Sequence, residues 1–158
     1  MNRSESGADL LNAPDLSVPF KMEDFQVHGI GGGFIVVSHY GDNAISAARV
    51  DLGVLGERWA TIDDALLYLH RTAGLTSSKC VATGLKVGGA GIVLYYDSKD
   101  EDIAENRRML LTALAHKLEK FTKTNILCLP SNLKTEDLVH LYKVNEKLKM
   151  DFTEQNND

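Results

Sequence analysis

Two kinds of hydrophobic pattern follow one another along this chain. Near the start, residues 25–28 alternate apolar and polar side chains, and residues 34–37 form a continuous apolar run rich in β-branched residues. Residues 44–50 form a weaker third run. A glycine cluster separates the first two runs and a Gly-Asp-Asn sequence separates the second and third, as is typical of hairpin turns. The pattern predicts three consecutive strands arranged as a β-meander.

From residue 61 the apolar positions recur every three or four residues, which is typical of an amphipathic helix. Thr61 is a good N-cap, and two aspartates in the first turn favour a helix N-terminus. The expected inward face holds Ile62, Ala65, Leu66, Leu69 and Ala73. Gly74 is expected to end or bend this helix.

The last third of the chain alternates strand and helix patterns. Residues 92–96 are apolar throughout, as in a strand buried on both faces, and residues 126–129 form a second such run. A helix pattern spans 102–121, and another begins with Thr135 as its cap and has Leu148 on its inward face. The fold class is therefore α/β: a mixed, mostly parallel sheet, built from a β-meander and a βαβα unit and flanked by helices.

The length of 158 residues and the 44% of hydrophobic residues are those of one globular domain. We expect a flexible N-terminal arm over residues 1–20, a single domain over 21–150 and a disordered tail over 151–158. No apolar run approaches the about 20 residues of a membrane helix, so no membrane partner is expected.

The net charge and the cysteine content indicate which binding partners and which cellular compartment to expect. The formal net charge is −5 and no basic stripe occurs, which argues against nucleic acid as a partner. The start of the chain has no signal-peptide core, and the two cysteines are no disulfide framework. We expect a cytoplasmic protein.

Two glycine-rich segments resemble nucleotide-binding loops, but neither contains the complete motif. The cluster at 29–33 has Phe34 where the last glycine of a dinucleotide fingerprint belongs. The segment 84–91 has Ala90 and Gly91 where a phosphate-binding loop needs Lys and Ser or Thr. Its glycines instead indicate that backbone passes close either to a neighbouring element or to a ligand.

The remaining chemistry-bearing residues form no recognisable centre. The segment 76–79, Thr-Ser-Ser-Lys, has Thr where a serine nucleophile belongs and is interpreted as a polar turn, with Lys79 as an anion contact. Five scattered histidines lack metal-ligand spacing, so no metal site is expected. Cys80 and Cys128 are interpreted as small buried hydrophobic residues.

Residues 76–91, TSSKCVATGLKVGGAG, resemble the M-T-Y-K-N-A-A-A-G-L-x-L-G-G-A-K stretch of the Glu/Leu/Phe/Val amino-acid dehydrogenases. The order of the predicted elements from residue 63 to about 148 also matches the N-terminal, substrate-binding and dimerisation domain of that family. The resemblance implies the fold of that domain, self-association into a dimer, and a ligand site at Lys79, Gly88, Gly89 and Gly91. The ligand it implies is a small amino or keto acid.

The chain departs from the family at the residues that carry catalysis. Lys79 falls on the lysine that holds the substrate carboxylate, but the catalytic lysine falls on Gly91, which cannot take a proton. The G-G-T-R-M loop falls on residues 48–52, with Arg49 nearby, and the catalytic aspartate falls close to Pro130. We also expect no NAD-binding domain in this chain, and therefore no cofactor, no catalytic residue and no dehydrogenase activity.

Three hypotheses about function follow. The first is a stand-alone, catalytically degenerate dimerisation domain that binds a small ligand or a protein partner. The second is a cofactor-independent enzyme with a repurposed pocket in a specialised biosynthetic pathway, in which Lys79 is the nucleophile or charge anchor. Its candidate acid and base partners are Tyr95, Tyr96, His39 and His116. The third, half of a split dehydrogenase, is the weakest, because a partner is not expected to restore a base at Gly91.

Overall fold

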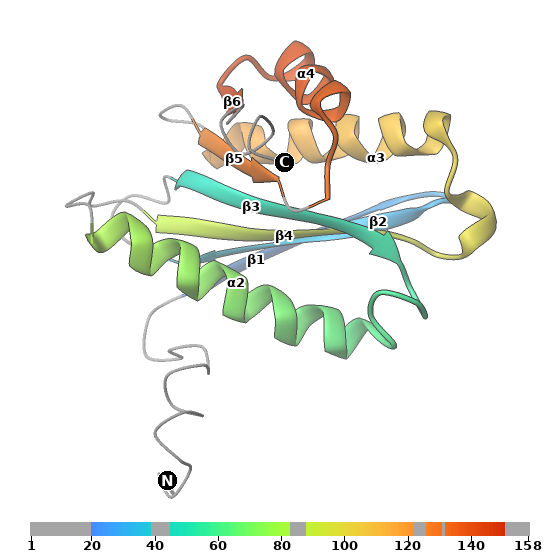
Figure 1. Ribbon diagram of the computed structural model, residues 1–158, viewed down its shortest axis with the longest axis horizontal. Coiled ribbons are helices and arrows are strands. Elements are labelled where there is room, and N and C mark those ends of the chain that lie inside the picture. Colours follow the sequence, from blue (N-terminus) through green and yellow to red (C-terminus); the bar gives the residue numbers. More distant parts are fainter. Residues whose placement is uncertain (1–19, 39–44, 83–87, 122–125, 131, 151–158) are drawn as a thin grey trace, which may run out of the picture.

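The structure is a computed structural model that describes residues 20–38, 45–82, 88–121, 126–130 and 132–150. The expected N-terminal arm and C-terminal tail lie outside these residues, apart from Phe20. The described chain forms one six-stranded sheet with helices on both faces (Figure 1). The fold class expected from the sequence, a mixed α/β sheet flanked by helices, is confirmed.

The sheet has the strand order β1-β2-β4-β3-β5-β6. β1 pairs antiparallel with β2 and β2 antiparallel with β4, whereas β4–β3, β3–β5 and β5–β6 are parallel pairs. The strands are β1 (Phe20–Val27), β2 (Gly31–Ser38), β3 (Ile45–Val54), β4 (Gly88–Tyr96), β5 (Ile126–Pro130) and β6 (Leu148–Met150).

The first two strands form the expected hairpin, but the expected β-meander is wrong at its third strand. Gly29 turns the hairpin with a positive φ of 76°, and Ile30 N–H donates to the Val27 carbonyl at 3.0 Å. β4 lies between β2 and β3, and it is parallel to β3. A crossover through α2 therefore joins β3 to its neighbour β4, so β3 is a central strand with a partner on each side.

One helix covers one face of the sheet, and two helices cover the other (Figure 1). α2 (Ile62–Ala82) packs against β2, β3 and β4. On the opposite face lie α3 (Ala104–Lys117) and α4 (Thr135–Val144), which pack against each other. Short 3-10 helices, η1 (Lys99–Glu101) and η2 (Leu118–Phe121), precede and follow α3.

Two hydrophobic clusters hold these layers together. The α2-side cluster contains Phe34, Val36, Trp59, Ala65, Leu69, Ala73, Val93 and Tyr95. The larger cluster on the other face joins β2, β3 and β4 to α3, α4 and the start of β6, with fully buried Ile35, Ile92, Leu94, Leu111 and Leu138 among its members. Both faces of the central strands are therefore withdrawn from water, as their continuous apolar runs predict.

Three sequence-based boundaries differ from the structure. α2 does not end at Gly74 but continues to Ala82, since a lone glycine is tolerated within a helix. α4 is capped by Asp137, whose Oδ2 accepts from the Lys134 backbone N–H at 2.8 Å, and not by Thr135. Leu148 is buried as expected, but on β6 and not on the last helix.

Candidate functional site

The four residues predicted to bind a ligand lie on two adjoining elements. Lys79 lies on α2, so the segment 76–79 is helical and the expected polar turn is wrong. The Thr76 hydroxyl donates to the Thr72 carbonyl at 2.9 Å, a bond within the helix. The side chain of Lys79 lies outside the part of the chain that the structure describes. Gly88, Gly89 and Gly91 lie in β4, and the binding role of all four residues stays a prediction.

At Gly91 the backbone of α2 lies close against the sheet. A Cβ atom added at Gly91 would lie 2.7 Å from the Leu69 carbonyl oxygen and 3.0 Å from the Ala73 backbone nitrogen. Such distances to backbone atoms leave no room for a side chain in this packing. At this position, of the two explanations for the glycine-rich segment, the close approach of a neighbouring element is the one observed. Arg49 is half-buried beside Gly91 on β3.

A buried carboxylate, which sequence analysis missed, joins β3 to α2. Asp51 is fully buried; its Oδ1 accepts from Arg58 Nη2 at 3.0 Å and its Oδ2 from the Tyr68 hydroxyl at 2.5 Å. Arg58 also lies over the ring of Trp59, 5.4 Å from its centroid. Asp51 is the one acidic residue in the segment 48–52, and this is the sequence signal for the group. Both carboxylate oxygens are satisfied, which makes Asp51 a structural anchor.

At the end of β5 a side chain continues the sheet. Leu52 N–H donates to Asn132 Oδ1 at 2.9 Å, and Asn132 Nδ2 donates to the Leu52 carbonyl. This amide therefore pairs with β3 in the way a strand would. The resemblance places a catalytic aspartate close to Pro130. Asn132 lies two residues further on, and its side chain makes this structural contact.

A ladder of polar contacts holds α3 and α4 side by side. Arg107 donates from Nε to Asp137 Oδ1 at 2.9 Å and from Nη2 to Asp137 Oδ2 at 2.7 Å. Next along the helices, Thr112 Oγ1 and His140 Nε2 share a hydrogen bond of 2.8 Å. The hydrogen bond with Asp137 raises the pKa of Arg107 above its usual value, so this guanidinium stays charged.

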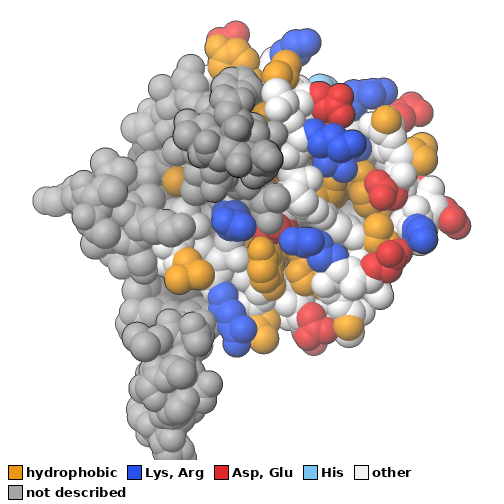
Figure 2. Space-filling model, viewed as in Figure 1, with side chains coloured by type: hydrophobic (Ala, Val, Ile, Leu, Met, Phe, Trp, Pro, Cys, Tyr) orange, Lys and Arg blue, Asp and Glu red, His pale blue; other side chains and the backbone are white. Residues whose placement is uncertain are grey.

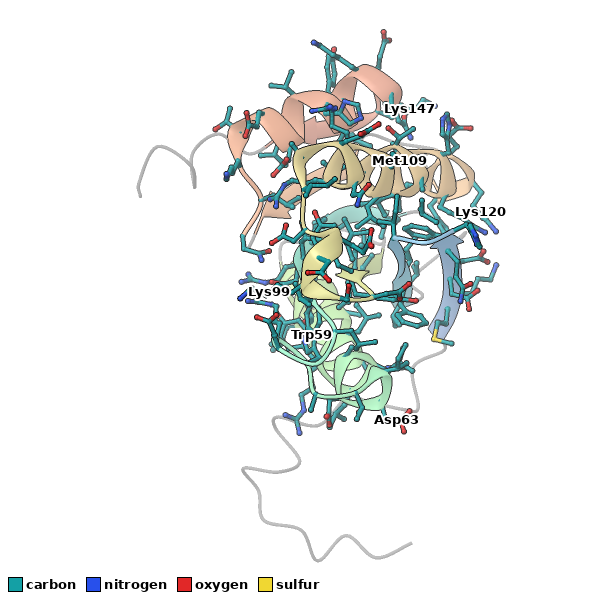
Figure 3. The ribbon with its side chains drawn as sticks, turned by 90° about the vertical axis from the view of Figure 1, so that its right-hand side faces the viewer. Trp59, Asp63, Lys99, Met109, Lys120 and Lys147 are labelled. Carbon is teal, nitrogen blue, oxygen red and sulfur yellow. The ribbon has the colours of Figure 1, made fainter. Side chains whose placement is uncertain are left out.

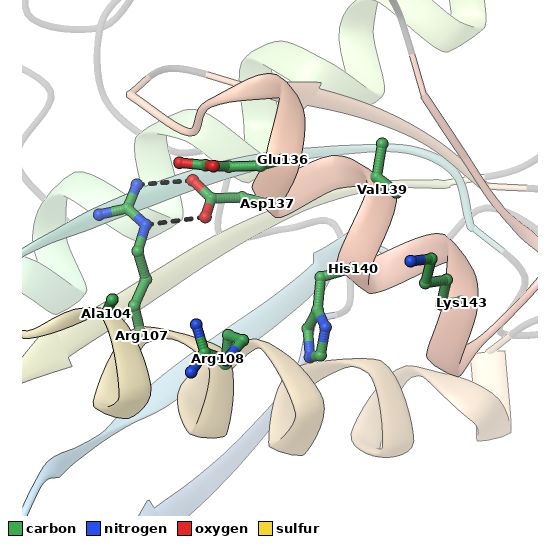
Figure 4. Close-up of a pocket in the computed structure, with 8 residues that line it drawn as sticks. All are labelled: Ala104, Arg107, Arg108, Glu136, Asp137, Val139, His140 and Lys143. Carbon is green, nitrogen blue, oxygen red and sulfur yellow. Dashed lines mark hydrogen bonds and ion pairs between the residues drawn. The ribbon is translucent and has the colours of Figure 1, made fainter.

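Beside this ladder a cavity of about 410 Å³ opens between the two helices (Figure 4). A second, shallower groove of about 670 Å³ runs between α3 and the end of β1. Arg108 and His140 line both of them. None of the residues predicted to bind a ligand lines either space. Neither space can be predicted from the sequence, because both depend on how α3 packs against α4 and β1.

The candidate acid and base residues of the repurposed-enzyme hypothesis are poorly placed for proton transfer. Burial raises the pKa of both Tyr95 and Tyr96, helped by the nearby carboxylates of Asp97 and Asp102 respectively. Both phenols therefore stay protonated at neutral pH, and the buried Tyr96 hydroxyl has no hydrogen-bond partner among the described residues. His116 is exposed and contacts Glu119 at 3.0 Å, and His39 lies outside the described residues.

Among the described residues, metal-ligand groups and helices that could span a membrane are both absent. Within them, no group of three or more His, Cys, Asp or Glu side chains is arranged to hold a metal ion. No helix in the same part of the chain is long and apolar enough to span a membrane. On the face shown in Figure 2, basic and acidic side chains of the described residues are interspersed, without a single basic stripe.

Comparison with known proteins identifies the fold. No protein-family model and no curated protein sequence matches this chain. Among solved structures, it is similar to the L-tryptophan dehydrogenase of Nostoc punctiforme, with 12% sequence identity and a TM-score of 0.57 over 89% of this chain and 38% of that chain. It is also similar to the leucine-bound hetero-hexameric glutamate dehydrogenase of Thermus thermophilus, with 12% identity and a TM-score of 0.55 over 87% and 35% of the two chains.

The chain thus has the fold of a part of the amino-acid dehydrogenases and spans somewhat more than a third of the length of the two structures it matches. This agrees with the resemblance to one domain of that family that its sequence carries. At 12% identity the likeness extends to the fold alone.

Proposed function

We propose that this chain is a catalytically degenerate, amino-acid-dehydrogenase-like dimerisation domain, a binding module that pairs with a second copy of itself. The observation that carries the proposal is the edge of the sheet at β1. This strand is eight residues long and, among the described residues, pairs on one side alone, with β2. Its other side offers backbone N–H and C=O groups to a partner strand.

One face of β1 also lacks a cover. Met22 is paired with Val36, whose side chain belongs to the α2-side cluster, so Met22 faces that side of the sheet. α2 packs on β2, β3 and β4, and Met22 remains 52% exposed. A second copy placed edge to edge would bury this methionine and extend the sheet across a two-fold axis, the commonest oligomer symmetry. The similar glutamate dehydrogenase is itself a hetero-hexamer.

The packing at Gly91 supports the loss of the ancestral catalysis. The family's catalytic lysine corresponds to this position, and in this chain the backbone of α2 fills the space a side chain would need. Without a group that exchanges a proton there, general-base chemistry at this position is lost. The alternative of a repurposed enzyme finds less support, because the two candidate tyrosines have raised pKa values.

We further propose that the module keeps a site for a small amino or keto acid at Lys79 and the β4 glycines Gly88 and Gly89, before the point where the backbone of α2 closes over Gly91. Arg49, next to Gly91 on β3, offers a second positive charge in the same region. A thermal-shift screen with amino and 2-keto acids tests this part. A ligand at 100 times its dissociation constant stabilises the folded state by about 2.7 kcal/mol, and Lys79→Ala is expected to abolish that shift.

Size-exclusion chromatography with light scattering tests self-association. We expect a dimer for the wild type and a monomer for Met22→Lys, because a charge would be buried at the joined edge. Leu67→Lys is the matched control, since Leu67 is 50% exposed on α2, away from β1. A wild-type monomer, or equal effects of the two substitutions, would overturn the proposal.

A further inference from the structure

The cavity between α3 and α4 and the groove between α3 and β1 meet at two side chains. Arg108 of α3 and His140 of α4 line both spaces. Volumes of about 410 and 670 Å³ lie within the range of small-molecule sites, roughly 300–1,000 Å³. Figure 4 shows Arg108 on α3 and the His140 ring on the side of α4 that faces it, with Lys143 further along α4.

Some of the charged side chains at this junction form an ion pair, and others do not. Arg107 and Asp137 neutralise each other through two hydrogen bonds. Arg108 and Lys143 are exposed and have no ion-pair partner among the described residues, and Glu136 is the remaining carboxylate of the cavity. The cavity therefore has an excess of positive charge that is free to meet an anion.

The N-terminus of α3 faces the same space. Ile103, the N-cap of α3, has no side chain that accepts from the first turn of the helix, and Ala104 of that turn lines the cavity. Uncapped N–H groups and the helix dipole favour a negative charge there. His140, which lines both spaces, shares a hydrogen bond of 2.8 Å between its Nε2 and Thr112 Oγ1.

The neighbouring groove combines an apolar stretch with polar side chains. Val27, Met109 and Ala113 form the apolar stretch, and the groove is also lined by Glu105 and other polar side chains. Met109 remains 46% exposed on α3 (Figure 3). An exposed methionine provides an adaptable apolar surface. A charged cavity and a groove with an apolar stretch, joined at Arg108, match a molecule with an acidic head and an apolar body.

We propose that this junction binds a monocarboxylate with an apolar body, with its carboxylate between Arg108 and Lys143 and its body along Met109 and Ala113. The site lies on the α3–α4 side of the sheet and shares no residue with the predicted site at Lys79 and β4. It does not depend on the dimerisation proposed above.

Octanoate is a suitable probe, with acetate and the uncharged octanamide as comparison ligands. Binding is measured by calorimetry and by backbone amide shifts in ¹H–¹⁵N spectra of the full chain. We expect octanoate to bind at least about tenfold more tightly than either comparison ligand, because each lacks one of the two matching parts. The shifted amides are expected in α3, α4 and the end of β1.

The double variant Arg108→Ala/Lys143→Ala is expected to weaken octanoate binding at least about tenfold. Its matched control is Arg71→Ala/Lys99→Ala, which removes one arginine and one lysine that line neither space and should leave binding unchanged. Both pairs are exposed, so folding is preserved and is checked by circular dichroism. Absence of octanoate binding, amide shifts on the α2 side, or equal losses in the two double variants would overturn the proposal.

Discussion

Arg107 of α3 and Asp137 of α4 meet in a two-pronged ion pair, with hydrogen bonds of 2.9 and 2.7 Å. The carboxylate also accepts from the Lys134 N–H and so caps α4. One side chain therefore both starts a helix and fixes that helix to its neighbour. The side chain of Asp137 is 5% exposed, so this contact is largely shielded from water.

We expect Arg107→Leu to lower the free energy of unfolding by about 3 kcal/mol, because it leaves a buried carboxylate without its counter-charge. Arg108→Leu is the matched control: Arg108 is the next residue, is exposed, and has no ion pair among the described residues, so a change within about 0.5 kcal/mol is expected. Urea unfolding measures both. Equal stabilities of the two variants would contradict the role given to the pair.

Gly91→Ala is expected to destabilise the fold by about 1–3 kcal/mol, because the new methyl group would collide with the backbone of α2. Gly74→Ala adds the same methyl group to α2 itself, where nothing lies within 4 Å. There we expect a gain of about 0.5–1 kcal/mol from the better helix propensity of alanine. Thermal unfolding of the two variants should therefore move in opposite directions, and a neutral Gly91→Ala would refute the close packing.

Tyr68→Phe removes the hydroxyl that donates to the buried carboxylate of Asp51. A hydrogen bond to a charged group contributes about 1.5–3 kcal/mol, and we expect a loss of stability of that order. The same substitution in an Asp51→Leu background should cost much less, because the acceptor is gone. A double-mutant cycle by urea unfolding measures the difference, and additive effects would show that the bond contributes nothing.

The pair between Glu23 of β1 and Lys120 of η2 should make stability depend on pH. A hydrogen bond from Lys120 Nζ, 2.8 Å from Glu23 Oε1, holds the pKa of Glu23 below its ordinary 4.5, helped by the charges of Lys117 and Lys21. Since the folded pKa is the lower one, the stabilisation is present above pH 4.5 and is lost as the pH falls through the folded value. Figure 3 shows Lys120 beside the edge strand.

Because the pair is partly exposed, its contribution is expected to stay below about 1 kcal/mol and to decrease with added salt. Lys120→Met should lose less stability than the wild type between about pH 6 and about pH 3. Carboxyl-carbon NMR titration should find a higher pKa for Glu23 in this variant. An unchanged pKa would show that Lys120 does not act on the carboxylate.

The elements of this fold were largely predictable, but the order of the strands was not. Alternation, helical periodicity and the cap at Thr61 locate the strands and helices, and Asp64 N–H does donate to Thr61 Oγ1 at 3.2 Å. The turn sequence at 41–43 favoured a hairpin, yet β3 joins β4 through α2. The burial of β3 on both faces is visible only in the structure: Ala48, Val50 and Leu52 on one face and Asp51 on the other are all buried, as a central strand requires.

The candidate sites also differ in how far they could be predicted from the sequence. Glycine at position 91 predicts a close approach of backbone, and the structure identifies α2 as the neighbour. The cationic junction at Arg108 and Lys143 could not be predicted, because it exists only once α3 and α4 are placed side by side. Neither residue stands out in the sequence, where each is one of 17 basic side chains.

The most direct test of the proposed module is a distance between two copies at the β1 edge. A nitroxide label is placed at Asp24→Cys in a chain whose Cys80 and Cys128 are replaced by serine, and the dipolar coupling between copies is measured by electron paramagnetic resonance. Joined edge strands lie about 4.8 Å apart, so we expect the two labels within about 20 Å of each other. A label at Asp63→Cys, at the start of α2, should give a longer distance. Absence of coupling between copies at Asp24, or a shorter distance at Asp63, would contradict the account.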